Sequence, residues 1–372
     1  MPPGLDPHRP GVVVAGPWRG LAGTWPAFRA ALVQWCARSG WPVLADPLSG
    51  LRGDAALPLV AGYDLLLEDP AALAPAAPPL QVLRLGPLPA SRRLQRWLEQ
   101  LPGQQLLITE GEPRPLDPLG RVDAQWSQGL ASWLAAQPLA PSPQPTPAPA
   151  QAWQAAEQRL QGWLDAVLPL EPAPPVFREP WLARALDRLL PPDLPLLLAN
   201  SSPVRDWETF ASGLHRRAVH GFRGASGIDG TLSQACGLAQ ALGQLVLVSG
   251  DLALLHDSNG WLWRSQLRGR LTVVLVDNAG GGIFEQLPIR TDPDASLDFE
   301  RLFAMPQAVD PLALAAAHGV PGRRVQRPAD LAADLAWALA QPLALVQVCS
   351  ERRADGAWRQ RLRTMAARQC LP

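Results

Sequence analysis

The chain has 372 residues, of which 33 are basic and 33 acidic, so its formal net charge is zero and its length allows two domains with sizeable cores. This balance provides no overall field for nucleic acid or an anionic membrane, and we expect neither as a partner. Every basic residue is an arginine, which excludes a P-loop and a Schiff-base lysine, because both need a lysine amine.

Short apolar runs alternate with amphipathic stretches over the first third of the chain. The runs have strand length and are bounded by Gly, Pro or Asp, which predicts strands at residues 11–16, 41–46, 63–68, 81–86 and 104–109. Helical spacing of apolar residues predicts helices at 25–38 and at 91–101, the second with Ser91 as its N-cap. We therefore expect residues 1–137 to form a compact α/β domain.

A proline-rich segment follows, in which nearly every second residue of 138–150 is proline. Such a segment is extended and joins neither core, so we assign residues 138–175 to a linker that contains a helix at 151–168. The alternation then resumes and predicts a second α/β domain at 176–372. Its expected helices are 181–190, 206–216, one from about 231, 311–318 and 328–340, and its expected strands are 194–199, 218–220, 244–249, 271–276 and 343–348.

Residues 244–284 have the order strand, helix, strand and glycine-rich turn, which predicts a βαβ unit. Asp251 and Asn278 each directly follow a strand, and ligands of parallel sheets sit at the carboxyl ends of strands. One carboxylate and one amide oxygen suit Mg²⁺, and Gly280 can add a carbonyl oxygen. Taken singly, Asp251 also fits a helix-capping turn, and Asn278 fits an ordinary turn.

The loop at 223–230, RGASGIDG, precedes the helix expected from Thr231. Its glycines fit either a plain connection or a backbone cradle at a helix N-terminus. The GxxGxxG spacing differs from the GxGxxG of a dinucleotide-binding loop.

Asn278 lies twenty-seven positions after Asp251, and Gly250-Asp251 with a closing Asn looks like the thiamine-diphosphate motif. The segments GDLALLHDSNG, DNAGGGIFEQLP, ANSSPVRDWETF and RGASGIDGTLSQACG further resemble the MenD family, the 2-succinyl-5-enolpyruvyl-6-hydroxy-3-cyclohexene-1-carboxylate synthases. The resemblance implies two doubly wound parallel-sheet domains, a central one and a diphosphate-binding one. It also implies thiamine diphosphate with Mg²⁺, or Mn²⁺ in its place, held by Asp251, Asn278 and the Gly280 carbonyl.

The same resemblance assigns two further groups of residues. Those expected to contact the cofactor are Ser226, Gly227, Ile228, Gly250, Asp251, Leu252 and Asn278. Those expected to contact substrate are Ser201, Arg205, Arg223, Ile283 and Phe284. Ile228 matches the apolar wedge under the thiazolium ring, and the two arginines suit polycarboxylate substrates.

The activity implied by the resemblance is decarboxylation of 2-oxoglutarate and addition of the succinyl-semialdehyde carbanion to isochorismate, in menaquinone or phylloquinone biosynthesis. Family members begin with a pyrimidine-binding domain whose Glu activates the cofactor. No residue here matches that Glu, so we expect no catalytic residue in this chain. We expect a homo-oligomer or a separate pyrimidine-domain chain as partner. Another lyase of acetolactate-synthase type and a non-catalytic cofactor-binding subunit remain as alternatives.

Cysteine usage and hydropathy predict the compartment. The four cysteines, Cys36, Cys236, Cys349 and Cys370, are far apart and form no CxxC pair, which is typical of reduced thiols. Met1 is not followed by the apolar core of a signal peptide. The longest uncharged run, 231–250, contains Ser, Gln and Gly residues, so we expect no membrane span and a cytoplasmic protein.

Overall fold

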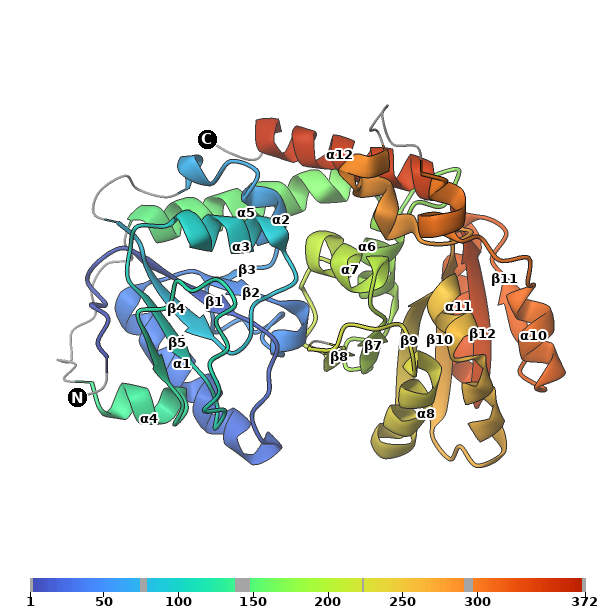
Figure 1. Cartoon of the computed structure of the whole chain (residues 1–372), viewed down its shortest axis with the longest axis horizontal. Helices are drawn as coiled ribbons and strands as arrows, with labels where there is room; N and C mark the ends of the chain where they lie inside the picture. The colour runs from blue at the N-terminus through green and yellow to red at the C-terminus, as the bar shows by residue number, and fades with distance from the viewer. Residues whose placement is uncertain (1–2, 74–78, 138–147, 223, 291–296, 370–372) are drawn as a thin grey trace. The chain divides into compact units, whose positions relative to one another are not determined.

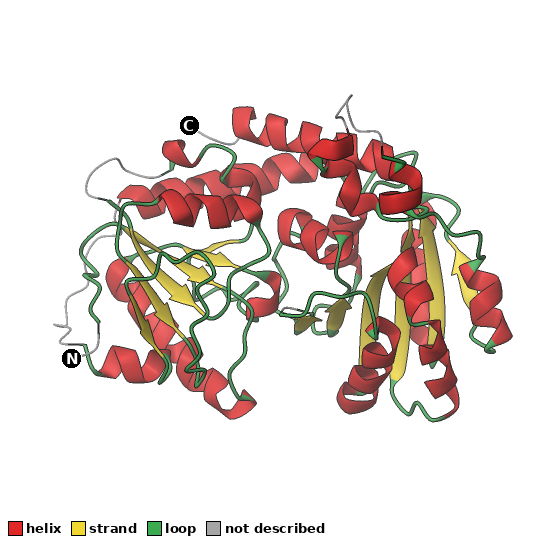
Figure 2. Ribbon diagram, viewed as in Figure 1, coloured by secondary structure: helices red, strands yellow, loops and turns green. Residues whose placement is uncertain are grey.

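The computed structural model describes residues 3–73, 79–137, 148–222, 224–290 and 297–369. The chain forms two compact units. Unit 1 contains residues 1–163, 213–216 and 363–372, and unit 2 contains residues 164–212 and 217–362. Each unit is built on its own parallel sheet (Figures 1 and 2), which confirms the predicted α/β fold class.

The sheet of unit 1 has six parallel strands in the order β3-β2-β1-β4-β5-β6. Their bounds are β1 Gly11–Ala15, β2 Val43–Ala45, β3 Leu59–Val60, β4 Gln81–Leu85, β5 Gln105–Ile108 and β6 Ala124–Trp126. The chain leaves β1 toward β2 and β3 and then returns to the other side of β1 to form β4. The reversal of strand order therefore lies between β1 and β4, where a doubly wound sheet can open a ligand crevice.

Helices cover both faces of this sheet (Figure 1). The helices are α1 Trp25–Ser39, α2 Tyr63–Leu66, α3 Arg92–Gln100, α4 Leu130–Ala135 and α5 Ala148–Val167. On one face, α1 and α4 pack through Trp35 and Trp133, whose ring centroids are 5.0 Å apart. On the other, Trp97 of α3 contacts Trp153 of α5 at 5.8 Å. Burial of these large rings supplies much of the apolar core.

One predicted strand of unit 1 is wrong. Residues 63–66 of the expected strand 63–68 form helix α2. Asp64 is buried there and accepts hydrogen bonds from the Ser91 hydroxyl at 2.5 Å and from Arg93 at 2.7 Å. A short apolar run does not distinguish a strand from a buried helical turn, and these distant polar partners decide between them.

The sheet of unit 2 also has six parallel strands, in the order β11-β12-β10-β9-β7-β8. Their bounds are β7 Leu196–Leu198, β8 Val219–Gly221, β9 Gln244–Gly250, β10 Arg270–Asp277, β11 Gly322–Arg324 and β12 Leu343–Cys349. From β7 the chain passes outward to β8 and then back to β9 on the opposite side of β7. The reversal of strand order thus lies between β7 and β9.

The helices of unit 2 form two layers around its sheet (Figure 2). They are α6 Glu179–Leu189, α7 Ser202–Phe210, α8 Thr231–Leu242, α9 Asp251–His256, α10 Pro311–Ala317, α11 Leu331–Ala340 and α12 Arg352–Gln369, the last of which continues into unit 1. Helix α8 packs with Leu247 and Val273 in one apolar cluster. Leu182 of α6 and Trp207 of α7 lie near Val248 and Val276 on the opposite face.

Several boundaries in unit 2 differ from the prediction. Helix α7 covers Ser202–Phe210, so residues 211–216 of the helix expected at 206–216 are not helical. Strand β11 and helix α12 were not predicted at all, and neither were β3, β6 and α4 of unit 1. The expected proline-rich segment 138–150 falls outside the described residues up to 147, and 148–150 already belong to α5.

Two further observations concern the hydropathy of the helices and the state of the cysteines. Among the helices that the structure describes, none has the length and apolar character needed to cross a membrane. Cys36, Cys236 and Cys349 are free thiols, whereas Cys370 lies outside the described residues.

Candidate functional site

Two neighbouring strands of unit 2 bring Asp251 and Asn278 to one edge of the sheet. Strands β9 and β10 are paired in parallel with Gly250 opposite Val276. Asp251 follows Gly250 as the first residue of α9, and Asn278 follows the last residue of β10. The carboxyl ends of both strands therefore place an acidic and an amide side chain beside each other, as the sequence predicted.

The carboxylate of Asp251 is held by backbone N–H groups. Its Oδ1 accepts from Leu252 N at 2.8 Å, and its Oδ2 accepts from Gly280 N at 2.6 Å. Burial raises the pKa of Asp251 to about 7, because little solvent remains to stabilise the charge. Within the described part of the chain, no ion pair neutralises this carboxylate. A cation bound beside it would stabilise its ionised form.

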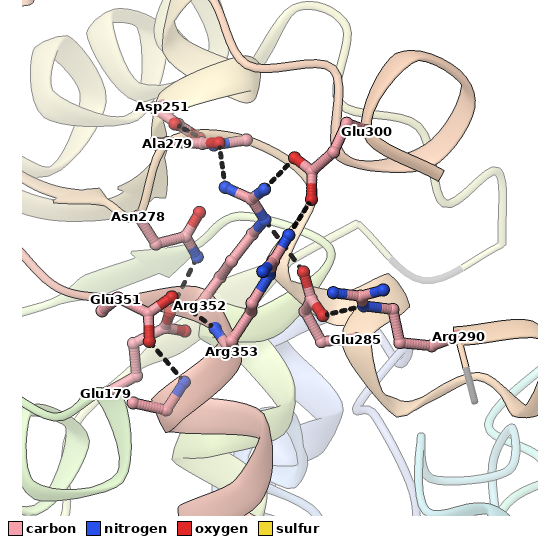
Figure 3. Close-up of polar contacts among 12 residues, drawn as sticks. Glu179, Asp251, Asn278, Ala279, Glu285, Arg290, Glu300, Glu351, Arg352 and Arg353 are labelled. Atoms are coloured by element: carbon pink, nitrogen blue, oxygen red, sulfur yellow. Dashed lines mark hydrogen bonds and ion pairs between the residues drawn. The ribbon is translucent and has the colours of Figure 1, made fainter. Parts of the chain in front are cut away.

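The side chain of Asn278 is 6 % exposed, and its two polar atoms have different environments. The amide Nδ2 donates to Glu179 Oε1 at 2.7 Å. The oxygen Oδ1 is buried and has no hydrogen-bond partner among the described residues. Figure 3 shows this oxygen turned away from Glu179, on the side where Asp251 lies. An unpartnered buried oxygen costs free energy, which a bound cation would recover.

The turn after Asn278 requires glycine. Gly280 has φ +125°, and a Cβ added there would lie 2.1 Å from Ala304 O. Its N–H donates to Asp251, and its carbonyl accepts from Gly282 N at 2.9 Å. A carbonyl oxygen has two lone pairs, so one remains for a further ligand.

Arg352, near the start of α12, holds this turn from outside (Figure 3). Its guanidinium donates to Ala279 O at 2.9 Å and to Glu285 Oε1 at 2.9 Å, and it forms an ion pair with Glu300. Arg290 contacts the other oxygen of Glu285 at 2.7 Å. These contacts fix the segment on both sides of the glycines, so the turn does not depend on glycine conformations alone.

The loop before α8 is tied to the end of β7. Asn200, two residues after the end of β7, donates to Gly227 O at 2.5 Å. Ser226 and Gly227 are exposed, and Ile228 is half-buried with its carbonyl accepting from the Thr231 hydroxyl at 2.8 Å. The loop residues predicted to contact the cofactor therefore lie near the reversal of strand order between β7 and β9.

The predicted substrate residues divide into two groups. Ser201 and Arg205 lie at the start of α7, where Arg205 donates to Ser201 O at 2.8 Å. Ser201 has φ +74°, an unfavourable conformation for a residue with a side chain and one that is concentrated at functional sites. Ile283 and Phe284 continue the glycine turn and are half-buried. Arg223 lies outside the described residues.

These residues fit a diphosphate-bound divalent cation. The donor set is one carboxylate, one amide oxygen and one carbonyl oxygen, all hard ligands of the kind that Mg²⁺ takes. Among the described residues, no three His, Cys, Asp or Glu side chains gather to hold a metal without other ligands. A Cβ added at Gly250 would meet nothing within 4 Å, so packing does not demand glycine there. The open space at this strand end is available to a ligand.

Sequence reasoning missed Glu179, Asn200 and Arg352. Glu179 lies 99 residues from Asn278 in the chain and Arg352 lies 73 residues from Ala279, so no local spacing reveals either contact. Burial alone would raise the pKa of Glu179, but the adjacent Arg359 guanidinium holds it below its usual range. The sequence of α6 does not single out Glu179, since the helix also contains Arg184, Asp187 and Arg188.

Comparison with known proteins gives two family matches. Residues 7–198 match the family described as the middle domain of thiamine pyrophosphate enzymes. Residues 210–348 match the thiamine pyrophosphate enzyme C-terminal TPP binding domain.

Two similar proteins carry the same name. The chain is 54 % identical to a 2-succinyl-5-enolpyruvyl-6-hydroxy-3-cyclohexene-1-carboxylate synthase of Synechococcus sp. (strain RCC307), over 97 % of this chain and 62 % of that protein. It is 54 % identical to the same-named protein of Prochlorococcus marinus (strain MIT 9313), over 96 % of this chain and 62 % of that protein. The chain thus spans about 62 % of the length of these relatives.

The fold also resembles a solved structure. The crystal structure of benzoylformate decarboxylase from Polynucleobacter necessarius aligns with a TM-score of 0.61 over 92 % of this chain and 62 % of that one. The sequences are 14 % identical, so this likeness concerns the fold alone.

Proposed function

Since the chain belongs to the thiamine pyrophosphate enzymes, and among them to the 2-succinyl-5-enolpyruvyl-6-hydroxy-3-cyclohexene-1-carboxylate synthase family, we propose that it takes part in that synthase reaction. The reaction decarboxylates 2-oxoglutarate and joins the remaining four-carbon unit to isochorismate, a step of menaquinone or phylloquinone biosynthesis. Bound thiamine diphosphate supplies the electron sink for loss of carbon dioxide. The protein residues bind, orient and shield the reactants.

The observation that carries this proposal is the buried, unpartnered Oδ1 of Asn278 beside the uncompensated carboxylate of Asp251. We propose that these two atoms and the Gly280 carbonyl hold Mg²⁺, which anchors the cofactor diphosphate. Mn²⁺ has similar ligand preferences and would replace it. The remaining contacts that we propose for the cofactor come from Ser226, Gly227, Ile228, Gly250 and Leu252.

Substrate recognition is proposed for the residues around the end of β7 and after the glycine turn. Arg205, with Arg223, would bind substrate carboxylates, because a planar guanidinium pairs with a carboxylate through two hydrogen bonds. Ser201 would add a hydroxyl contact. Ile283 and Phe284 would form apolar walls that exclude water. A substrate carboxylate leaves as carbon dioxide more readily where little water stabilises its negative charge.

The domain roles are part of the proposal. We assign residues 1–137 to the central domain, 138–175 to the connection and 176–372 to the diphosphate-binding domain. No residue in this chain is proposed to activate the cofactor. A Glu from a pyrimidine-binding domain outside these 372 residues would do so, and we propose either a homo-oligomer or a pairing with a pyrimidine-domain chain. We place the protein in the cytoplasm, which its free Cys36, Cys236 and Cys349 support.

The test follows isochorismate consumption with 2-oxoglutarate, thiamine diphosphate and Mg²⁺. The purified chain is assayed alone and with an added pyrimidine-binding domain of a similar synthase. We expect turnover only after the addition. Turnover by the chain alone would contradict the absence of an activating residue. Silence in both assays, despite measured cofactor binding, would favour a cofactor-binding subunit without catalysis.

A further inference from the structure

Glu179, in the first turn of α6, contacts Asn278 on the side opposite the proposed cation. Glu179 is 3 % exposed, and its Oε1 accepts from Asn278 Nδ2 at 2.7 Å. Figure 3 shows the two side chains facing each other, with the amide oxygen of Asn278 on the far side. The contact therefore involves only one of the two polar ends of the amide.

A carboxylate next to the amide determines which end of the amide faces the site. An ionised carboxylate accepts hydrogen bonds and donates none, so only the NH₂ end of Asn278 can face Glu179. The oxygen must then face the opposite direction, where it is buried and unpartnered. Without Glu179, this contact would no longer favour the observed orientation over the reversed one, which directs NH₂ toward the cation position.

Glu179 is itself held by a buried ion cluster. Its Oε2 accepts from Arg359 Nη2 at 2.5 Å, and Arg359 also contacts both carboxylate oxygens of Asp206, at 2.7 and 2.5 Å. Arg359 and Asp206 are 2 % and 5 % exposed. Asp206 contacts the same guanidinium as Glu179, but of these two carboxylates only Glu179 accepts a hydrogen bond from Asn278. This difference separates a role in the cluster from a role toward the site.

We propose that Glu179 is a positioning residue, which holds the Asn278 amide with its oxygen directed at the divalent cation. This inference rests on the proposed metal site at Asp251 and Asn278. It predicts that metal affinity depends on Glu179 and not on the buried ion cluster as a whole. Replacing a residue that hydrogen-bonds a metal ligand typically lowers the metal affinity by about 10–100-fold.

The decisive variant is Glu179→Gln. Its amide keeps the shape of the side chain, but Arg359 attracts the new oxygen, so the NH₂ group turns toward Asn278. Asn278 must then turn its own oxygen toward Gln to accept that proton, and its NH₂ toward the cation. We expect the Mn²⁺ dissociation constant, measured by electron paramagnetic resonance on the full chain with saturating thiamine diphosphate, to rise by about 10–100-fold.

The matched control is Asp206→Asn. It removes the same single negative charge from Arg359 and leaves the contact between Glu179 and Asn278 in place. We expect both variants to lose thermal stability, whereas only Glu179→Gln loses Mn²⁺ affinity and Asp206→Asn stays within about threefold of wild type. Equal losses of affinity in the two variants would overturn the inference, since they would show a general effect of the cluster.

A second substitution tests the orientation directly. Asn278→Asp in the Glu179→Gln background provides an oxygen on both sides of the planar group, so one oxygen accepts from Gln and the other faces the cation. We expect the double variant to bind Mn²⁺ at least about fivefold more tightly than Glu179→Gln alone. No recovery would count against the inference.

Two outcomes keep the inference separate from the function on which it depends. If wild type binds Mn²⁺ and Glu179→Gln binds it equally well, the inference alone is overturned. If wild type binds no Mn²⁺ in the presence of the cofactor, the metal site fails and the inference with it. Should Glu179→Gln not fold, Glu179→Asp is the second variant. It keeps a negative charge near Arg359, but its side chain is one methylene shorter and lies farther from Asn278. The same loss of affinity is expected there, and unchanged affinity would overturn the inference.

Discussion

The two sheets of the molecule reverse their strand order in the same way, yet the two reversal points have different contents. In unit 1, between β1 and β4, backbone fills the space: a Cβ at Gly16 would lie 1.6 Å from Pro87 O, and one at Gly86 would lie 3.1 Å from Pro17 O. A cavity of only about 30 Å³ remains there. In unit 2, the ends of β9 and β10, next to the reversal between β7 and β9, contain a buried carboxylate without a counter-charge and an unpartnered amide oxygen.

The difference shows that strand order indicates where a ligand can bind but not whether one does. The Gly-Pro turns after β1 and β4 close the first edge by direct contact. The second edge keeps polar groups that are costly to bury alone. Four substitutions test this contrast, and they are ordered here by the size of the effect that we expect.

The largest effect is expected for Gly16→Ala in unit 1. The new methyl group would overlap the Pro87 carbonyl, so the turns must separate, and the free energy of unfolding should fall by about 3 kcal/mol or more. Gly23→Ala is the matched control, because a Cβ there meets nothing within 4 Å. Urea unfolding measures both variants. Equal stability of the two would mean that the first edge is not closed by backbone contact.

The next effect concerns the cation that we propose at the second edge. Asp251→Ala removes the carboxylate that we assign to the cation, and Mg²⁺-dependent affinity for thiamine diphosphate should fall by about 100-fold, or about 2.7 kcal/mol. Calorimetry measures it, with Asp334→Ala on α11 as the control that keeps full affinity. Unchanged binding by Asp251→Ala would remove the metal assignment.

A smaller effect is expected at Gly250, where the surrounding space is open. Gly250→Ala meets no neighbouring atom, so the stability of the free protein should change by less than about 1 kcal/mol. The same methyl group would occupy space proposed for the cofactor and weaken its binding by about tenfold. Gly237→Ala on α8 also meets no atom within 4 Å and should leave affinity unchanged. Full affinity in Gly250→Ala would mean that the ligand does not approach this strand end.

The smallest effect is a pH dependence in unit 1. Glu110 follows β5, accepts from Leu130 N at 2.8 Å, and has its pKa raised by burial. The folded state therefore holds the proton more tightly than the unfolded state. The resulting stabilisation is complete below the unfolded pKa of about 4.3 and is lost as pH rises through the higher folded pKa.

Glu110→Gln cannot ionise and keeps an acceptor for Leu130. Wild type should therefore lose stability relative to Glu110→Gln over that pH interval, by less than about 1 kcal/mol in total. Melting temperatures of both proteins between pH 3.5 and 8 measure the difference. Parallel curves would show that this strand-end carboxylate is not affected by burial, in contrast to Asp251.

The sequence was sufficient where structure depends on local pattern. The strands that precede Asp251 and Asn278 are mostly apolar, and their order predicted that the two residues lie at the same edge of the sheet. It was insufficient where distant partners decide. Residues 63–66 form helix α2 and not the expected strand, and Asp64 contacts Ser91 and Arg93 there, 27 and 29 residues away.

The same limit applies to the candidate site. Asp251 and Asn278, which follow strands, were identified from their spacing in the sequence. Glu179 and Arg352 reach the site from the starts of α6 and α12, and only the packed fold brings them there. Arg223 and the segment at 291–296 lie outside the described residues, so the expected role of that arginine stays a prediction.

The parallel register of β9 and β10 makes the site sensitive to insertions and deletions within these strands. Gly250 is opposite Val276, and Asp251 and Asn278 stand one and two residues beyond that pair. One residue inserted into β10 would turn Asn278 to the opposite face of the sheet. Two residues would restore the face but displace the side chain by about 7 Å along the strand. Length variation among homologous chains is therefore expected in the connections outside these strands and not within them.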